Sequence, residues 1–447
     1  MSGSVQSNEL TGMRARLRAQ GSEIFREQAR RRIAAQTPAA GLLQELRAAG
    51  AAAFAASELP TSKTESWKYS RIGPLLEDGL LDRAAPGTAH IESIPGLDAQ
   101  RLVILDGVPQ PLSGPLAAGL SVTPFSLLSG SRLVAAQAHL GRIATTSGRP
   151  FVALNGALVE DGLLIQVAAG ARIDRPIELV IAQSVDATAR GAHPRVLVVL
   201  EEGARATLVE RQVGGAPMFT NAVVEIALAA GARLDHLHLA TAAGAGRWLG
   251  ALAVAVGRDA GYDLSLVERG AAFRRNEIDI RLTGPGAEVA VRGAGLTRGA
   301  GHLDHQMNLE HAAPRCSSRQ QFRLIAGETS RAILNGRIHI HPGACKTDAE
   351  LQARGLLLTR GAEIDLKPEL EIYADDVKCA HGATLGQLDA GALFYLRSRG
   401  IDEASARALL SFAFLGEIIE ALPLAAVRES IRPALHAAFV ASAEEEQ

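Results

Sequence analysis

Cysteine is scarce in this chain. Its 447 residues include three, Cys316, Cys345 and Cys379. An odd and sparse set does not make a disulfide framework and is typical of a reducing compartment. The N-terminus lacks the apolar segment of a signal peptide, and no run of about 18 apolar residues predicts a membrane-spanning helix. We therefore expect a cytoplasmic protein that does not insert into a membrane.

The chain also has little net charge of either sign. The formal net charge is −2, so we do not expect a broad basic surface that would bind the phosphates of nucleic acid. The sequence contains no GxxxxGK[ST] phosphate-binding loop, no GxSxG nucleophile elbow and no multi-cysteine pattern of the ferredoxin type. These absences predict that the chain neither hydrolyses ATP by itself nor holds a resident cluster.

The residues that are present have the composition of a folded protein, with 47% hydrophobic and 21% charged residues. Apolar periodicity divides the chain into four segments. We predict an N-terminal helical region at 1–60, a linker and mixed α/β segment at 61–150, a strand-rich core at 151–390 and a C-terminal helical region at 391–447. In the last segment, Asp402 is expected to cap a helix and Pro433 to begin the final one.

The core segment alternates apolar and polar residues over short runs, which is the period of β-strands. A Gly-Ala corner recurs between the runs, and glycine permits the positive φ of a tight turn. Repeats of about 25–33 residues predict a coiled stack of strands, a β-helix, although the hairpins of a β-sandwich would give the same alternation. The runs lie at 163–167, 196–200, 223–228, 252–256, 262–267, 277–282, 288–291, 337–341 and 370–372, and the corners at Gly170, Gly203, Gly231, Gly286 and Gly361.

Cys379 and His381 are the first candidates for chemistry. On a strand they would share one face, because side chains alternate with period two. A thiolate and an imidazole on one surface can ligate a metal or form a nucleophile–base pair. The alternative is a buried cysteine beside a surface histidine, since two ligands do not complete a metal site.

Two further histidine groups are candidates. His302 and His305 are three residues apart, which suits a helix or loop better than a strand face. With His311 they form either a zinc site or polar histidines on a strand edge or subunit surface. His339 and His341 alternate with isoleucines and predict one strand face, and Cys345 follows four residues later. That face is either a metal site or a solvated surface.

The cluster Trp67-Lys68-Tyr69 lies in the linker after Pro60. Aromatic residues beside charged ones usually anchor a linker to the core. Ligand binding is the alternative interpretation.

Taken together, these motifs resemble the SufD family of the SufB/SufD superfamily. The N-terminal Glu65-Ser-Trp67-Lys68-Tyr69 is similar to that family's Trp-Lys-Tyr motif. At the position where SufB proteins typically carry a His-Glu-Ala pattern, this chain has Cys379-Ala-His381-Gly382, which looks like SufD. The C-terminal part of the resemblance is carried by 346–348, 356–358, 368–372, 374–377, Cys379 to Thr384 with Gly382 between them, 394–400 and Ala404.

The resemblance implies a right-handed parallel β-helix flanked by N-terminal and C-terminal helical regions. It also implies a non-catalytic scaffold subunit of the SufBCD complex for iron–sulfur cluster assembly. The chain would pair with a SufB-like protein and bind a SufC-like ATPase through its C-terminal helices. ATP would be bound by SufC only, and a nascent cluster would form at the SufB interface. His381 matches the family histidine at that interface, and Cys379 matches a family cysteine.

No stably bound cofactor is implied for the isolated chain, which could form a homodimer. Two other classes of function compete with this interpretation. A polysaccharide-cleaving β-helix enzyme would need clustered carboxylates in a groove, and no such constellation follows the strands. A metal enzyme would use the group of His302, His305 and His311.

Overall fold

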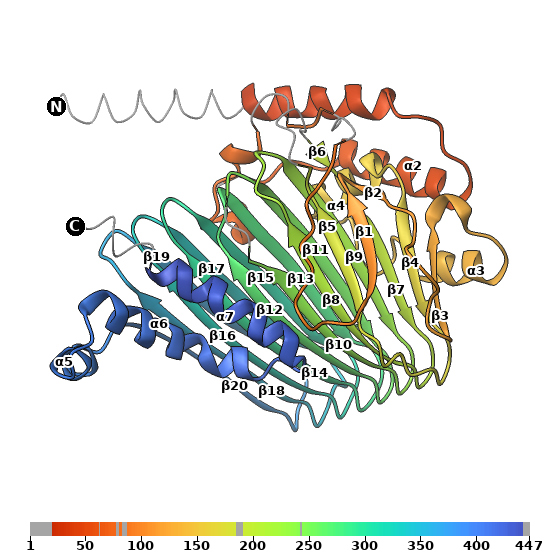
Figure 1. Cartoon of the computed structure of the whole chain (residues 1–447). Helices are drawn as coiled ribbons and strands as arrows, with labels where there is room; N and C mark the ends of the chain where they lie inside the picture. The colour runs from red at the N-terminus through yellow and green to blue at the C-terminus, as the bar shows by residue number, and fades with distance from the viewer. Residues whose placement is uncertain are drawn as a thin grey trace, which may run out of the picture.

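The computed structural model describes residues 20–61, 63–76, 80–82, 87–184, 191–241 and 244–440. Two ten-stranded sheets face each other, and the chain alternates between them as it winds (Figure 1). From β5 and β4 onward the ladders along both sheets are parallel. Such pairing excludes the sandwich of hairpins and confirms the predicted parallel β-helix core.

The two sheets are named here A and B. Sheet A contains β3 (Leu120–Pro124), β4 (Gly162–Val167), β7 (Arg195–Leu200), β9 (Phe219–Leu228), β11 (Arg247–Val256), β13 (Phe273–Leu282), β15 (His302–His311), β17 (Arg331–Ile340) and β19 (Glu363–Ile372), with β6 (Gly191–Ala192) paired to β9. Sheet B contains β2 (Val108–Pro109), β1 (Gln100–Leu105), β5 (Ile177–Ala182), β8 (Arg205–Val213), β10 (Arg233–Ala240), β12 (Gly261–Arg269), β14 (Glu288–Thr297), β16 (Ser317–Ala326), β18 (Asp348–Leu357) and β20 (Lys378–Gln387).

Every strand run predicted from the sequence falls in one of these strands or at its end. The parallel ladder also begins earlier in the chain than those runs, because β1 pairs in parallel with β5. One face of each strand points between the sheets, where the largest apolar cluster extends from Leu102 to Ile364. This shared interior makes the stack one continuous core.

The Gly-Ala corners turn the chain between sheets. Four of their glycines have the positive φ that was predicted: 68° at Gly170, 68° at Gly203, 66° at Gly231 and 73° at Gly286. Gly361 is an exception, since it does not adopt positive φ. A Cβ at Gly361 would instead lie 2.6 Å from the carbonyl oxygen of Glu328, so close backbone contact accounts for that glycine.

The N-terminal helices cover the outer face of sheet A. Residues 20–34 are helical, followed by α2 (Gly41–Ala56), α3 (Gly130–His139) and α4 (Pro150–Leu158). All nine residues of α4 are buried, because α2 packs on one side of it and β9 on the other. Short 3-10 turns occur at η1 (Glu65–Trp67), η2 (Gly73–Leu75) and η3 (Phe125–Leu127).

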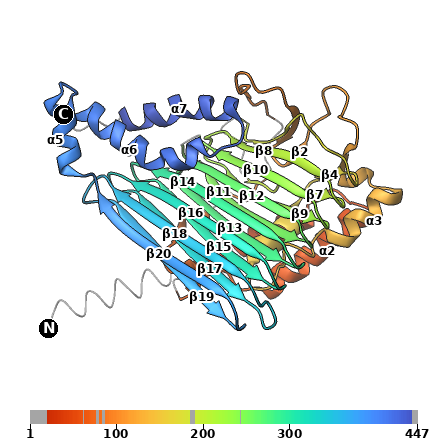
Figure 2. The ribbon, with the colours of Figure 1, turned by 90° about the horizontal axis from the view of Figure 1, so that it is seen from below.

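The C-terminal helices are α5 (Ala390–Ser398), α6 (Glu403–Glu420) and α7 (Ala425–Val440). Figure 2 shows α6 and α7 along one side of the stack, with α5 projecting beyond the strands. Apolar residues of α6 and α7 pack on the outer face of sheet B, and Arg323 of β16 forms an ion pair of 2.8 Å with Glu417.

Two predictions about these helices have different outcomes. Asp402 caps α6 as predicted, because its side chain accepts a hydrogen bond of 2.9 Å from the backbone N–H of Ser405. Pro433 does not begin a helix and instead lies inside α7. Apolar residues on both sides of Pro433, Ile431 and Leu435, belong to the same buried cluster. Tertiary packing therefore carries the helix through the proline. Among the described residues, no helix combines the length and the apolar character needed to cross a membrane.

Candidate functional site

The solenoid ends openly at β19 and β20. Within the described residues, β19 pairs only with β17 and β20 only with β18, so each has one unpaired backbone edge. All residues of β20 except Cys379 are exposed. Three large apolar side chains lie exposed at this end: Ile372, Tyr373 and Leu385. Strand edges and apolar side chains are thus accessible together.

Cys379 and His381 lie on β20, on one strand face as predicted. They pair in register with Ala349 and Leu351 of β18, which point into the core. Cys379 is half-buried, and burial raises the pKa of its thiol even though a hydrogen bond from the Ala349 backbone opposes the change. His381 is exposed. The thiol is therefore protonated at neutral pH, while the imidazole is accessible to a partner.

Gly382 and Thr384, the other β20 residues of the family motif, are both exposed. A Cβ at Gly382 would meet no atom within 4 Å, and its φ is not in the left-handed region. Local geometry within this chain does not require glycine at 382.

Trp67 attaches the linker to the outer face of sheet A. It is buried, lies nearly parallel to Phe273 with ring centroids 6.4 Å apart, and has the Arg275 guanidinium 4.0 Å from its ring centroid. Lys68 is exposed and lies 5.4 Å from the ring centroid of the half-buried Tyr69. Trp67 thus occupies the position of an anchor.

His302, His305 and His311 do not form one site, and their predicted helix or loop is wrong. All three lie on β15, where His302 and His305 point to opposite faces. His302 bonds to Ser70 at 2.8 Å, His305 contacts Glu268, and His311 bonds to Ser318 at 2.9 Å. They are also not surface residues: His305 and His311 are buried, and His302 is nearly so.

His339 and His341 share a face as predicted, with ring centroids 4.2 Å apart. Each pairs with a carboxylate: His339 with Glu371 at 2.8 Å and His341 with Glu310 at 3.1 Å. Cys345 is a free, half-buried cysteine. The two imidazoles are therefore half-buried, hydrogen-bonded to carboxylates and not a fully solvated face.

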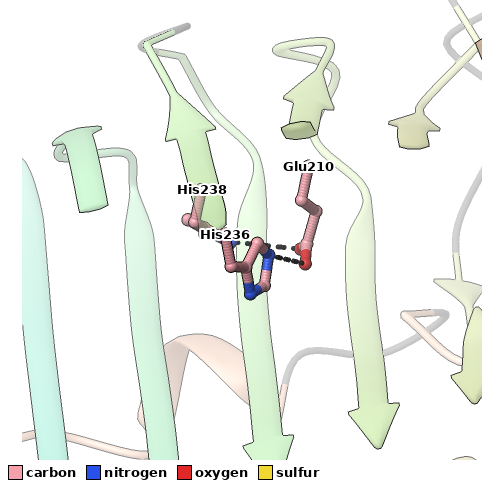
Figure 3. A group of neighbouring side chains, drawn as sticks. All are labelled: Glu210, His236 and His238. Carbon is pink, nitrogen blue, oxygen red and sulfur yellow. Dashed lines mark ion pairs between the residues drawn. The ribbon is translucent and has the colours of Figure 1, made fainter. Parts of the chain in front are cut away.

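A cluster that sequence reasoning missed lies inside the solenoid. Glu210 of β8 and His236 and His238 of β10 bring one carboxylate and two imidazoles together (Figure 3). All three are buried. The signal was in the sequence, because His236 and His238 have the same parity as the core residue Leu234. Their partner Glu210 comes from the preceding turn, so no local spacing reveals it.

The pKa values of the two histidines shift in opposite directions. Burial alone would lower the pKa of His238, but the carboxylates of Glu210 and Glu268 outweigh burial and raise it to about 10. Burial lowers the pKa of His236. Burial also opposes ionisation of Glu210, yet the neighbouring histidines hold the pKa of its carboxyl below the ordinary value. The resting cluster therefore contains an imidazolium at His238 and a neutral imidazole at His236.

The fold and the open end define a helix-flanked parallel β-solenoid protein. Two family models match the sequence: "SUF system FeS cluster assembly, SufBD core domain" over residues 181–414 and "SufBD protein N-terminal region" over residues 18–179. The chain belongs to the SufBD family of iron–sulfur cluster assembly proteins, within which it is a SufD homologue.

Three relatives illustrate the extent of the similarity. The iron–sulfur cluster assembly protein SufD of Escherichia coli is 33% identical over 371 residues, which cover 81% of this chain and 85% of that protein. A SufBD family protein of Synechocystis is 29% identical, over 84% of this chain and 86% of its own length. SufD of Bacillus subtilis is 26% identical, over 62% and 64% respectively.

Proposed function

We propose that this chain is the SufD-like scaffold subunit of a cytoplasmic SufBCD-type complex, which pairs with a SufB-like protein and binds a SufC-like ATPase. In this role it performs no catalysis itself. The observation that carries the proposal is the open end of the solenoid, where an unpaired strand edge, exposed apolar side chains and His381 occur together.

Pairing with a SufB-like partner is supported by the physical character of this end. An exposed strand edge is a template for the addition of another strand. A partner with its own open solenoid end would satisfy the free N–H and C=O groups of β20 and cover Leu385, Ile372 and Tyr373. In isolation a second copy of this chain offers the same edge, so the free subunit forms a homodimer.

The cluster is the cargo of this interface. The imidazole of His381 is a suitable type of ligand for iron, and Cys379 lies two residues away on the same face. Burial raises the pKa of the Cys379 thiol, which makes it a poorer ligand than a thiolate. One imidazole and one protonated thiol do not hold a cluster, so the partner supplies the remaining ligands.

The C-terminal helices provide the surface for the ATPase. No residue of α5 is buried, and Phe394 and Tyr395 on it are exposed. Exposed aromatic side chains are typical anchors of protein interfaces. ATP is bound by the SufC-like protein only, since this chain has no phosphate-binding loop.

Co-purification tests the proposal. The chain is expressed with the SufB- and SufC-like proteins of its host as wild type, as His381→Ala and as Thr384→Ala, an exposed control on the same strand. The wild type and both variants are expected to assemble, and His381→Ala alone is expected to lose most of its iron and sulfide content. Failure of the wild type to bind either partner contradicts the scaffold role. Full cluster content in His381→Ala contradicts the role of that histidine.

A further inference from the structure

The buried group at Glu210, His236 and His238 lies within the solenoid, away from the open end. Its ligating atoms all lie within 4.8 Å of one another. We propose that these three side chains bind one divalent transition-metal ion of the zinc or ferrous type. The site would be separate from the cluster chemistry at β20, and it does not depend on the partners named above.

The distances between donor atoms suit such an ion. His236 Nε2 lies 3.3 Å from Glu210 Oε2, and His238 Nδ1 lies 3.1 Å from Glu210 Oε1. Two ligand atoms that are each about 2.0–2.1 Å from a tetrahedral Zn²⁺ lie roughly 3.3 Å apart. Figure 3 shows both imidazoles turned toward the carboxylate. An ion therefore fits among these donors after small side-chain adjustments, and His238 releases its proton to solvent when its Nδ1 binds the ion.

The second ring nitrogen of each imidazole faces a polar side chain. His236 Nδ1 shares a hydrogen bond of 2.8 Å with the Tyr262 hydroxyl, and His238 Nε2 lies 3.2 Å from Glu268 Oε1. Metal-binding histidines usually carry such a partner on the nitrogen that does not bind the metal, which fixes the ring and its tautomer. Tyr262 and Glu268 are thus positioning residues.

One nitrogen of the group makes only an ion-pair contact in the described structure. His236 is completely buried, and its Nε2 lies 3.3 Å from Glu210 Oε2 without forming a hydrogen bond. An unsatisfied buried polar atom is costly, because it has lost its hydrogen bonds to water. A metal ion at this position would satisfy it.

Space for a fourth ligand adjoins the site. A cavity of about 20 Å³ is bordered by Glu210, His238, Gly250 and Asn276, and a water needs roughly 10–15 Å³. A side chain at residue 250 would reduce this space, since a Cβ there would lie 2.9 Å from Asn276 Oδ1. Two histidines, a glutamate and a water are a common set of ligands for Zn²⁺ and a known pattern for Fe²⁺.

The experiment uses the full-length chain stripped with a chelator and then titrated without oxygen. Co²⁺ serves as a spectroscopic probe, followed by competition with Zn²⁺ and with Fe²⁺. We expect one equivalent of Co²⁺ with visible d–d bands, displaced by at least one of the two competing ions. Glu210→Gln and the double variant His236→Asn with His238→Asn are expected to bind Co²⁺ at least a hundredfold more weakly.

His339 and His341 provide the matched control. The double variant His339→Asn with His341→Asn removes two neighbouring half-buried imidazoles and is expected to leave the d–d bands unchanged. The proposal is overturned if the wild type binds no Co²⁺, so that the group is only a buried ion pair. It is also overturned if the bands depend on His339 and His341 instead.

Tyr262→Phe provides a second test of metal binding in case the Glu210 and histidine variants do not fold. Loss of a partner to a metal ligand weakens metal binding by about 10- to 100-fold, whereas a role in packing alone leaves the Co²⁺ affinity unchanged. Unchanged affinity and d–d bands in Tyr262→Phe would contradict the proposed orientation of His236.

Discussion

Several histidines of this protein are buried in neutral form. His193 is almost completely buried, and neither of its ring nitrogens makes a hydrogen bond. Burial, with a smaller effect from the charge of Arg32, lowers its pKa to about 3. Burial likewise lowers the pKa of His302 and of His311 to about 4. Each of these groups connects the stability of the fold to pH.

The first prediction follows from the sign of these shifts. Below pH 6.5 the unfolded chain protonates these histidines and the folded chain does not, so the free energy of unfolding falls as the pH falls from about 6.5 toward 4. One such histidine contributes up to about 1.4 kcal/mol per pH unit. His193→Phe should reduce that slope in urea unfolding between pH 7 and pH 5.

The control for this prediction is His90→Gln, because His90 is exposed and 4.0 Å from the exposed Glu92. It should leave the slope of the unfolding free energy against pH unchanged. Equal slopes in His193→Phe and the wild type would show that His193 does not govern this dependence.

The sequence predicted the positions of some side chains correctly and those of others wrongly. The shared face of Cys379 and His381 followed from strand alternation alone. The group of His302, His305 and His311 was misjudged, because a three-residue spacing indicates a helix only where the backbone is helical, and here it is β15. Glu210 and His238 meet through the register of two turns, and a single sequence does not contain that register in readable form.

Among the elements, α5 differs from its neighbours. Apolar residues of α6 and α7 are buried on sheet B, whereas α5 buries none of its own. Phe394 is 74% exposed and Tyr395 is 57% exposed. The proposed ATPase would cover this aromatic helix face, which is uncovered in the described structure.

The second prediction concerns that helix. Phe394→Ala with Tyr395→Ala should weaken binding of the SufC-like ATPase by about ten- to a hundredfold, because buried aromatic anchors at interfaces each contribute more than about 1 kcal/mol. The thermal unfolding midpoint should not change. Titration calorimetry or surface binding to the purified ATPase measures the affinity.

Leu127→Ala is the matched control, since Leu127 is 68% exposed but lies at the opposite end of the solenoid in η3. Its affinity for the ATPase should equal that of the wild type. A loss of binding in Leu127→Ala, or full binding in the double variant, would exclude α5 as the docking element.

The elements themselves were partly predictable. Alternation located nine strands of the stack, among them β4, β9 and β17, but did not locate others such as β8, β10 and β15. An N-cap signal located the start of α6 at Asp402. Pro433 was misinterpreted because local propensity counts against a proline inside a helix, while the buried contacts of Ile431 and Leu435 outweigh that cost here. Packing energies of this kind are not visible in a local window of sequence.

At the scale of the whole molecule, the open end is the proposed site of assembly. Leu385 is 52% exposed on β20, and the edge of that strand is unpaired. If two copies join at this end, a charge on the edge strand should separate them. The third prediction is that Leu385→Lys converts the isolated chain from dimer to monomer in sedimentation velocity.

Val134→Lys provides the comparison, because Val134 is 66% exposed on α3, far along the stack from β20. It should leave the dimer intact. A Leu385→Lys chain that still dimerises at the same concentration would mean that the copies join elsewhere.

The architecture as a whole was predictable because one pattern repeats. Glycine corners such as Gly203 and Gly231 return in the same conformation, so each turn supports the interpretation of the next. The distribution of helices over the two sheets was not predictable. It depends on which outer faces are apolar, as with Leu237 and Leu239 of β10 under α6 and α7, and alternation does not distinguish inner from outer faces.

The unpaired edge of β20 also affects how the newly synthesised protein behaves. A newly made chain exposes an unpaired strand edge as soon as it folds. Strands of unrelated proteins can pair with that edge in place of the proposed partner. An orphaned copy is therefore the form most exposed to aggregation. If the proposed partner covers this edge, synthesis of the two proteins in matched amounts would protect this subunit from aggregation.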